Sequence, residues 1–484
     1  MKIRIGFWSG LFLSLWTSVS LADPTASALD QEIQSAIRSS QNVPNVGVSV
    51  GVVKDGKLVF AKGYGYRDRA RRLPSTEKTM YVAGSMSKAF TVAALVMESE
   101  AGHVSLSKPV RGYAGDFKLS IPQATEDATL IDLLSHQSGL PRHDCFWYIS
   151  DLARGELFAR LGYLGPNLDP KQTFRKAYQY NNLIFMAAGT VLERVSGARW
   201  EDYLRDRVLK PLGMSATSLD VPSLQQSQEP ALGYAGEDLL PYKDVESIAP
   251  AAAVNTNVLD MAKWLQFHLD HGVASSGKRL ISLDGMETMY KPRIDTVPGT
   301  GAYYAMGWRL DKWAGKRWIR HAGNMDGFLG LAGFVPDARL GTIVLTNQND
   351  SPVPTAVTQA VMKAFLGTQA LSEPLDLFVE ENGPRAAPAR GNEPVVVADL
   401  SSLDGRYSNP AYGEMSVAGG EVSYGAHRWK MRATSDADVV GVTLDLGGRT
   451  QEFLLKFSRD SVGKTSGFSV SFDENSTPFR FAKL

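Results

Sequence analysis

The residues in this sequence best suited to chemistry are a serine and a lysine three positions apart. Ser85 and Lys88 stand at the start of an apolar run over residues 89–97, which predicts a buried helix that ends near Gly102. Residues three apart share a helix face, so the Ser85 hydroxyl and the Lys88 amine can meet there. A partly desolvated lysine can lose its proton and act as a base, which makes Ser85 a candidate nucleophile.

The surrounding sequence separates this pair from other matches to the same Ser-x-x-Lys spacing. Four further matches begin at Ser75, Ser105, Ser275 and Ser461. None of them opens a long apolar run, and three of them meet a proline or lie in polar sequence that contains glycine. For any single match, a surface serine beside a surface lysine is the alternative interpretation.

A tyrosine and an asparagine form the second candidate pair. Tyr180 and Asn182 stand where an apolar helix over residues 183–195 begins, and Gly197 is expected to end that helix. A phenol beside an ammonium group ionises more readily and can exchange a proton with a serine. Asn182 offers a donor and an acceptor to a substrate amide. The alternative is a packing aromatic residue followed by a helix N-cap.

A histidine and a glycine form the third candidate pair. His321 and Gly323 lie between strand-like runs, and further strands are predicted over residues 331–334 and 341–346. Small residues at positions 322 and 323 let a substrate backbone approach the edge of a strand. Taken alone, His321 could equally be a structural histidine whose hydrogen bonds are satisfied.

Metal and thiol chemistry have weaker support. His268 and His271 lie three apart with no third ligand nearby, so we expect an exposed helix face, no metal site and no cofactor. Cys145 is the only cysteine, which rules out an intrachain disulfide. A thiol nucleophile assisted by His143 is the lesser alternative, because a lone cysteine is usually an inert buried residue.

The first 22 residues predict export. Lys2 and Arg4 precede an apolar segment that ends in small residues, as in a secretory signal cleaved after Ala22. Removing this segment leaves 49 basic against 51 acidic residues, a net charge of −2 without a polybasic signature for nucleic acid. We therefore expect a periplasmic or secreted protein with no stable membrane span, and a retained N-terminal anchor is the alternative.

The remaining chain divides into two parts joined by a linker. Its 484 residues, 44% of them hydrophobic, suffice for more than one domain, and the first is expected over residues 23–371. It includes a hairpin around Asp55-Gly56. Residues 372–396 combine prolines with polar and charged residues and predict a linker. Over residues 397–484, strand-like runs between 415 and 472 alternate with turns, which predicts a small antiparallel barrel.

Three motifs occur in a fixed order along the chain: Ser85-x-x-Lys88, Tyr180-x-Asn182 and His321-x-Gly323. Together they resemble the motifs of the serine β-lactamase and penicillin-binding superfamily. The resemblance is closest to the branch with class C β-lactamases, D-Ala-D-Ala carboxypeptidases, D-aminopeptidases and related esterases. It spans roughly residues 42–366 and includes three further phrases: LLSHQSGLP at 133–141, YAMGW at 304–308 and IVLTN at 343–347.

The resemblance implies an α/β, or α+β, three-layer domain. A central antiparallel sheet would be flanked by helices, with an inserted helical subdomain and a substrate cleft between the two. The phrase LDGRYSNPAYG at 403–413 resembles the start of the lipocalin-like β-barrel appended to some related peptidases. In those proteins the extra domain can mediate homo-oligomer assembly or restrict the cleft.

The resemblance also implies a role for each motif residue. Ser85 would be the nucleophile, and Lys88 and Tyr180 would form the proton-transfer pair. Asn182 would hold the substrate amide. The backbone N–H groups of Ser85 and Asn324 would form the oxyanion hole, where charge develops during acyl transfer.

His321 and Gly323 would lie on the strand that binds substrate. Penicillin-binding enzymes usually have a lysine at the position of His321. A mostly neutral imidazole attracts a carboxylate less than an ammonium does, so we expect weak β-lactamase activity.

The implied function is a metal-independent serine acyl hydrolase, a peptidase or amidase on peptide-like substrates that can include D-residues. A carboxylesterase with the same catalytic residues is one alternative, because the motifs do not show whether the enzyme prefers amide or ester substrates. A penicillin-recognising sensor that is acylated without turnover is another, which the complete set of catalytic residues disfavours. The expected partner is a small peptide-like or ester substrate and not a nucleic acid.

Overall fold

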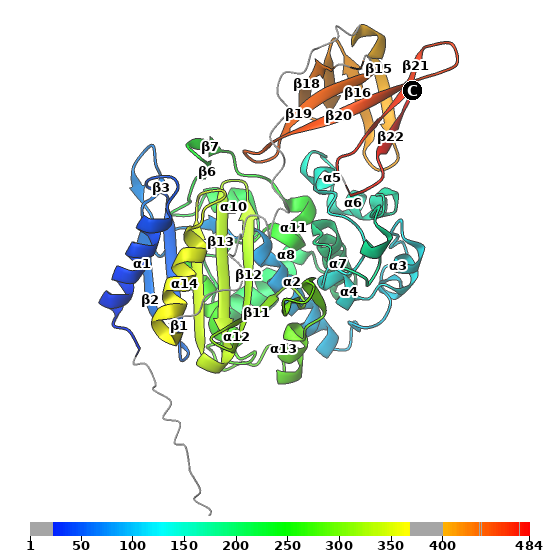
Figure 1. The fold of residues 1–484 in the computed structure, drawn as a ribbon. Coiled ribbons are helices and arrows are strands. Elements are labelled where there is room, and N and C mark those ends of the chain that lie inside the picture. Colours follow the sequence, from blue (N-terminus) through cyan, green and yellow to red (C-terminus); the bar gives the residue numbers. More distant parts are fainter. Residues whose placement is uncertain (1–22, 368–399, 435, 437, 474) are drawn as a thin grey trace, which may run out of the picture.

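The computed structural model describes residues 23–367 and 400–484, apart from 435, 437 and 474. Figure 1 shows a large domain of helices and strands with a smaller β-barrel at one end. The predicted signal peptide, residues 1–22, and the predicted linker, residues 372–396, lie outside the described residues. Within the part of the chain that is described, no helix is long and apolar enough to span a membrane.

An eight-stranded antiparallel sheet forms the centre of the large domain, in the order β2-β1-β14-β13-β12-β11-β10-β9. Its strands are β1 (Val48–Lys54), β2 (Lys57–Tyr64), β9 (Ile294–Val297), β10 (Ala302–Tyr304), β11 (Arg309–Trp313), β12 (Lys316–Met325), β13 (Phe328–Val335) and β14 (Leu340–Thr346). β13 and β14 are buried along their whole length, because both faces of the sheet are covered. The predicted hairpin joins β1 to β2, and its Asp55 and Gly56 have positive φ angles of 51° and 77°.

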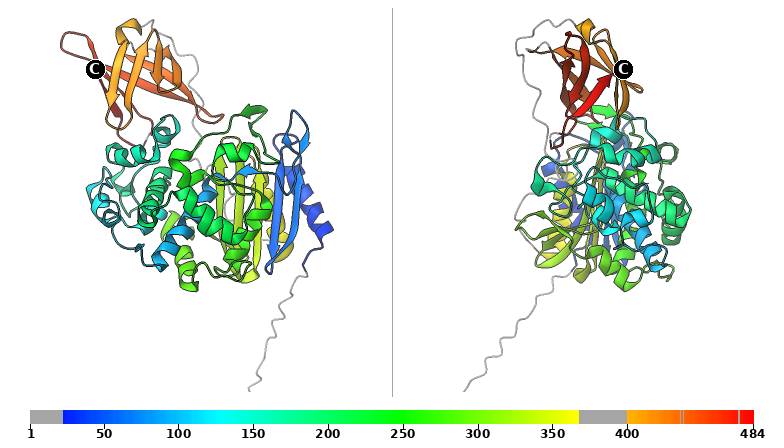
Figure 2. Two further views of the ribbon diagram at one scale, coloured as in Figure 1. Left: turned by 180° about the vertical axis from the view of Figure 1, so that it is seen from behind. Right: turned by 90° about the vertical axis from the view of Figure 1, so that its right-hand side faces the viewer.

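Helices on both faces of this sheet produce the predicted three-layer fold (Figure 2). α1 (Ala26–Ser40) and α14 (Val353–Leu366) pack together on one face, and α12 (Val258–Leu269) covers the other. Successive side chains of β14 point to opposite faces of the sheet, so the strand contributes to the cores on both sides. Val344 belongs to the core beneath α1 and α14, whereas Ile343 belongs to the core on the α12 side.

The helix α2 (Ser87–Glu100) connects the sheet to the helical subdomain. It is the apolar helix predicted after Ser85, and it is buried on nearly all sides. Its neighbours include α7 (Asn182–Ser196) and α11 (Ala249–Ala252). The predicted inserted subdomain is present, because four further helices lie with α7 beside the sheet in Figure 1: α3 (Pro122–Asp127), α4 (Leu130–Leu134), α5 (Asp144–Tyr148) and α6 (Arg154–Arg160).

The C-terminal part is a closed antiparallel barrel of eight strands, from β15 (Gly405–Asn409) to β22 (Phe479–Lys483). The sequence pattern did not predict β15 or β22, which pair with each other and close the barrel. The barrel rests on the helical subdomain (Figure 1). The Arg160 guanidinium donates to the Ala411 carbonyl at 3.0 Å across this contact.

One expectation about the histidines is wrong. His268 is only 2% exposed, so it does not lie on an exposed helix face. Its ring packs at 4.3 Å from the Trp264 ring, and its Nδ1 forms a hydrogen bond with the Tyr290 hydroxyl. Burial lowers the pKa of His268 from 6.5 to about 3. The sequence pattern missed this because a histidine that packs as a neutral aromatic ring looks polar in a hydropathy reading.

This depressed pKa predicts acid sensitivity. Between pH 6.5 and about 3 the unfolded chain protonates His268 and the folded chain does not. The stabilisation is therefore complete above pH 6.5 and falls by up to about 1.4 kcal/mol per pH unit below it. We expect His268→Asn, whose amide can still pair with Tyr290, to be less stable at pH 7.5 but less dependent on pH. Urea unfolding of both proteins from pH 7.5 to 4.5 measures this, and parallel curves would contradict it.

Candidate active site

Ser85 lies in a tight turn, η1 (Gly84–Met86), directly before α2. Gly84 has a φ of +52°, and a Cβ there would lie 2.7 Å from the Asn324 carbonyl oxygen. On the facing strand β12, a Cβ on Gly323 would lie 1.9 Å from the Ala83 carbonyl oxygen. The two glycines therefore let the nucleophile turn pack directly on the sheet. We expected Gly323 to admit a substrate backbone, and in the structure its contact is with the turn that carries Ser85.

Both predicted proton-transfer groups reach the Ser85 hydroxyl. Lys88 Nζ lies 2.9 Å from Ser85 Oγ, and the Tyr180 hydroxyl donates to the same oxygen at 2.5 Å. The Lys88 Nζ also lies 4.6 Å from the centroid of the Tyr180 ring, within cation–π range. All three side chains are buried. A proton can therefore pass among these groups without a bridging water.

The Lys88 amine is oriented by oxygens from two other helices. It donates to Asn182 Oδ1 of α7 at 2.8 Å and to the Ala251 carbonyl of α11 at 3.1 Å. α11 can approach because residue 189 of α7 is glycine, where a Cβ would lie 2.1 Å from the Pro250 ring. An ammonium group has three N–H donors, and Ser85, Asn182 and Ala251 supply three acceptors.

The two adjacent asparagines have different roles. Asn181 is the N-cap of α7, because its Oδ1 accepts from the Ile184 backbone N–H at 3.0 Å. Asn182 is the first residue of the helix and its side chain points into the site, with Nδ2 3.1 Å from Asp144 Oδ1. The N-cap role that was the alternative for Asn182 therefore belongs to its neighbour.

Asp144 organises a part of the site that sequence reasoning missed. Its carboxylate accepts from Arg142 Nε at 2.7 Å and from Trp147 Nε1 at 2.8 Å, in addition to Asn182. Burial acts to raise the pKa of Asp144, but the Arg142 guanidinium and these hydrogen bonds hold it below its ordinary value. No spacing rule marks Asp144, which begins the short helix α5 (Asp144–Tyr148). The only signal available was its proximity to the loop at residues 137–142.

His321 lies on β12 beside the site, and its ring faces Tyr304. It is 1% exposed, with Nε2 2.9 Å from the Tyr304 hydroxyl and Nδ1 2.5 Å from the Ala322 carbonyl oxygen. A carbonyl can only accept, so Nδ1 carries a proton, and Nε2 shares a hydrogen bond with the Tyr304 hydroxyl. His321 is not among the described residues that line the pocket at Ser85.

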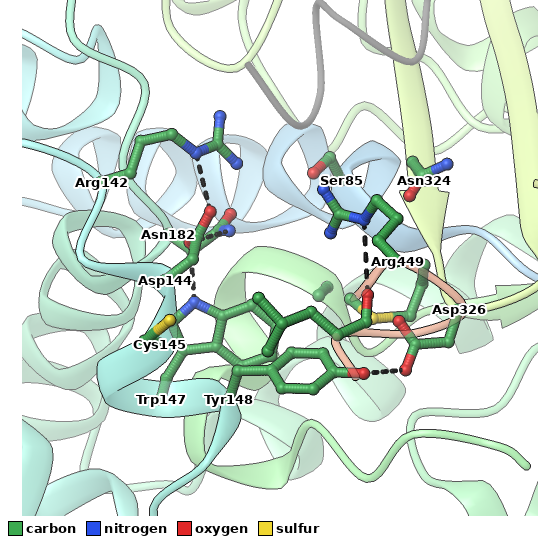
Figure 3. A pocket seen from close by; sticks show the side chains of 13 residues that line it. Ser85, Arg142, Asp144, Cys145, Trp147, Tyr148, Asn182, Asn324, Asp326 and Arg449 are labelled. Atoms are coloured by element: carbon green, nitrogen blue, oxygen red, sulfur yellow. Dashed lines mark hydrogen bonds and ion pairs between the residues drawn. The ribbon is translucent and has the colours of Figure 1, made fainter. Parts of the chain in front are cut away.

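A pocket opens at Ser85 (Figure 3). Two of the other predicted site residues, Asn182 and Asn324, line it. The remaining lining residues are Arg142, Asp144, Cys145, Trp147, Tyr148, Ala252, Met325, Asp326, Leu446 and Arg449. Leu446 and Arg449 belong to the barrel. All three sequence motifs precede residue 372, so no motif indicated that the barrel contributes to the pocket.

The lining of this pocket bears on thiol and metal chemistry. Burial raises the pKa of the Cys145 thiol, which disfavours the reactive thiolate. In the described ranges, no three His, Cys, Asp or Glu side chains come together as potential metal ligands. What the geometry does assemble is an activated hydroxyl. It lies at the N-terminus of a buried helix, beside the backbone of Asn324, where a developing negative charge is favoured.

Sequence comparison finds relatives with the same kind of domain. Residues 36–365 match the family model described as Beta-lactamase. The chain is 28% identical over 356 residues to the Unguisins hydrolase ungD' of Aspergillus campestris, which covers 68% of this chain and 64% of that protein. It is 26% identical over 330 residues to Protein flp of Staphylococcus aureus, which covers 64% of this chain and 61% of that protein. The chain thus spans less than two thirds of the length of these relatives.

Solved structures share the fold. The octameric penicillin-binding protein homologue from Pyrococcus abyssi aligns with a TM-score of 0.59 at 23% identity, covering 94% of this chain and 99% of that one. The class C β-lactamase from Rhodobacter sphaeroides aligns with a TM-score of 0.56 at 22% identity, covering 70% of this chain and 99% of that one. At such identities the likeness concerns the fold alone. With the family model matched over residues 36–365, this chain belongs to the β-lactamase family of serine hydrolases, within the superfamily that includes the penicillin-binding proteins.

Proposed function

We propose that this protein is an exported, metal-independent serine acyl hydrolase that forms an acyl-enzyme at Ser85 and acts on peptide-like amides. The observation that carries the proposal is the placement of Lys88 Nζ and the Tyr180 hydroxyl on the same Ser85 oxygen, at 2.9 and 2.5 Å. One of the relatives, the Unguisins hydrolase ungD', is named as a hydrolase, which is consistent with turnover. The proposal of export rests on the sequence of residues 1–22.

The proposed reaction has two steps at one carbonyl carbon. Ser85 Oγ attacks this carbon while its proton passes to the deprotonated member of the pair, Lys88 as a neutral amine or Tyr180 as a phenolate. The oxyanion takes hydrogen bonds from the N–H groups of Ser85 and Asn324. The C–N bond then breaks, and the leaving amine takes up the proton. In the second step water gives a proton to the same base and attacks the ester, and that proton passes to Ser85 Oγ as the acid is released.

Two features favour a substrate with an amide backbone. The pairing of β11 with β12 stops at Arg309–Arg320, while β12 continues past the Ser85 turn to Met325. A strand that extends beyond its neighbour can hydrogen-bond an extended peptide. Across the pocket, the Asn182 amide can both donate to and accept from a substrate amide. A rate panel of peptide p-nitroanilides, a D-Ala-D-Ala peptide, p-nitrophenyl esters and nitrocefin tests the proposal, and turnover of esters alone would make the protein a carboxylesterase.

His136 is a positioning residue for Tyr180. Its Nδ1 accepts from the Asn181 N–H at 3.1 Å, and its backbone carbonyl accepts from the Gln179 N–H at 2.9 Å. These two amides flank Tyr180, whose ring centroid lies 4.4 Å from that of His136. Burial, and then the Lys88 charge, hold the pKa of His136 well below its ordinary value. The ring therefore stays neutral and keeps its acceptor.

Replacing the nucleophile provides the first test. Ser85→Ala should abolish turnover and covalent labelling while leaving the fold intact, because the Ser85 hydroxyl is the oxygen that Lys88 and Tyr180 both contact. Labelling with a fluorophosphonate followed by peptide mass spectrometry measures this. The matched control is Ser275→Ala, which removes an exposed serine with the same Ser-x-x-Lys spacing. An adduct on another serine, or full activity of Ser85→Ala, would refute the assignment.

The proton-transfer pair provides the second test. Lys88→Ala and Tyr180→Phe should each lower kcat by roughly 100-fold or more, the usual cost of lost general acid–base catalysis. Because both groups contact one oxygen, the double variant should lose less than the product of the two single losses. Steady-state kinetics on one substrate give all four rates. Multiplicative losses would show that the two groups act independently.

The positioning role of His136 provides the third test. His136→Phe keeps the ring but removes the acceptor, so kcat should fall by roughly tenfold or more as Tyr180 loses its alignment. His136→Asn keeps an acceptor near Nδ1 and tolerates the φ of +59° at this position, so it should recover much of that loss. Thermal unfolding of both variants separates stability from alignment. Equal kcat values in the two variants would rule out positioning through the acceptor.

A further inference from the structure

A loop of the barrel forms part of the pocket that holds Ser85. This barrel loop, residues 446–449, joins β19 (Val439–Asp445) to β20 (Thr450–Arg459). Leu446 and Arg449 line the pocket together with Ser85. In Figure 3 the Arg449 guanidinium extends toward the part of the pocket where Ser85 and Asn324 lie. A residue of the second domain is therefore in place to contact a bound substrate.

Hydrogen bonds hold the barrel loop against the catalytic domain. Asn349 Nδ2 donates to the Gly447 carbonyl at 2.8 Å, and Asn349 Oδ1 accepts from the Gly327 N–H at 2.8 Å. Asn349 thereby ties the loop to the turn that follows β12. Within the loop, the Leu446 N–H donates to the Arg449 carbonyl at 2.8 Å. The loop is thus a folded turn with a defined position.

Two glycines permit this approach. Gly447 has a φ of +71°, and a Cβ there would lie 2.0 Å from Asp326 Oδ1. Gly448 has a φ of +76°, and a Cβ there would lie 2.4 Å from the Ala235 Cβ. Larger residues at these positions would push the loop, and Arg449 with it, away from the pocket.

Two guanidinium groups and two carboxylates line the pocket. Arg142 forms an ion pair with Asp144, whose carboxylate also accepts from Trp147 and Asn182. Asp326 accepts a hydrogen bond from the Tyr148 hydroxyl, and burial raises its pKa. Both pocket carboxylates therefore accept hydrogen bonds from the catalytic domain. The guanidinium of Arg449 is the cation that the barrel contributes to the pocket.

We propose that Arg449 binds a carboxylate of the substrate held at Ser85, so that the barrel selects anionic acyl substrates. The inference rests on the proposed acyl transfer at Ser85 and adds the substrate class. A guanidinium suits this role because its planar N–H groups match the two oxygens of a carboxylate. His321 of β12 is hydrogen-bonded to Tyr304 and is not among the described residues that line the pocket. The second domain supplies the guanidinium of Arg449.

The test compares matched esters that differ in one charge. In the first pair the charge is on the acyl side: the acyl chain of p-nitrophenyl pentanoate ends in a methyl group, whereas that of mono-p-nitrophenyl glutarate ends in a carboxylate. Phenyl acetate and the acetyl ester of 4-hydroxybenzoic acid place the carboxylate on the leaving group. For each pair, the ratio of kcat/KM for the charged ester to that for the neutral ester is the selectivity. Arg449→Gln should lower the selectivity for at least one pair by roughly tenfold or more.

Two further variants serve as controls. Arg449→Lys keeps the positive charge but lacks the planar pair of N–H donors. Its selectivity should therefore lie between those of Arg449→Gln and the wild-type protein. Arg459→Gln makes the same substitution at the far end of β20, where the exposed arginine pairs with Asp438 at 2.8 Å, and should leave the selectivity unchanged. Thermal unfolding confirms that each variant is folded.

The outcomes separate this inference from the proposed function. If the wild-type protein hydrolyses the esters and Arg449→Gln leaves both selectivities unchanged, the role of Arg449 is refuted while acyl transfer stands. If a fluorophosphonate fails to label Ser85 and no ester is hydrolysed, the proposed function fails and the inference fails with it. A fall in selectivity that Arg449→Lys partly restores supports the proposal.

Discussion

The structure depends above all on keeping one amine, Lys88 Nζ, in a fully buried position. A buried amine without acceptors would cost several kcal/mol, so its partners must be in place for the domain to fold. Those partners are the Ser85 hydroxyl, the Asn182 amide and the Ala251 carbonyl, which come from three separate segments of the chain. The packing of α2 against α7 and α11 and the assembly of the catalytic geometry are therefore one event. This coupling explains why the polar groups of the site lie inside an otherwise apolar core.

Close backbone contacts give this arrangement its accuracy. The nucleophile turn lies on β12 only because Gly84 and Gly323 leave room for each other's main chain. α11 approaches α7 only because residue 189 lacks a side chain. At the nucleophile turn, backbone atoms set the spacing, and backbone positions vary less than side-chain rotamers. At residue 189 it is the rigid Pro250 ring that lies against the helix. An oxyanion hole built from N–H groups needs that constancy, since its donors must be aligned before charge develops.

The barrel contributes two residues to the lining of the pocket. With the barrel loop tied to Asn349, the pocket has Leu446 and Arg449 in its lining in addition to residues of the catalytic domain. Selectivity and chemistry are thereby assigned to different domains. A change in the barrel loop could alter the preferred substrate without disturbing the Ser85, Lys88 and Tyr180 contacts.

The sequence by itself determined the fold class, the family and the residues around the nucleophile. These follow from local patterns: Ser85 and Lys88 share a helix face, and Tyr180 and Asn182 stand where the next apolar helix begins. It did not reveal Asp144, whose partners converge only once α5 and α7 have packed together, nor the burial of His268. It placed His321 near the site but could not show that the ring turns toward Tyr304. Arg449 lies 364 positions after Ser85 in the sequence, beyond all three motifs, and only the docking of the barrel brings the two into one pocket. Contacts set by spacing within one helix can be read from sequence, whereas contacts between domains depend on surfaces that exist only after folding.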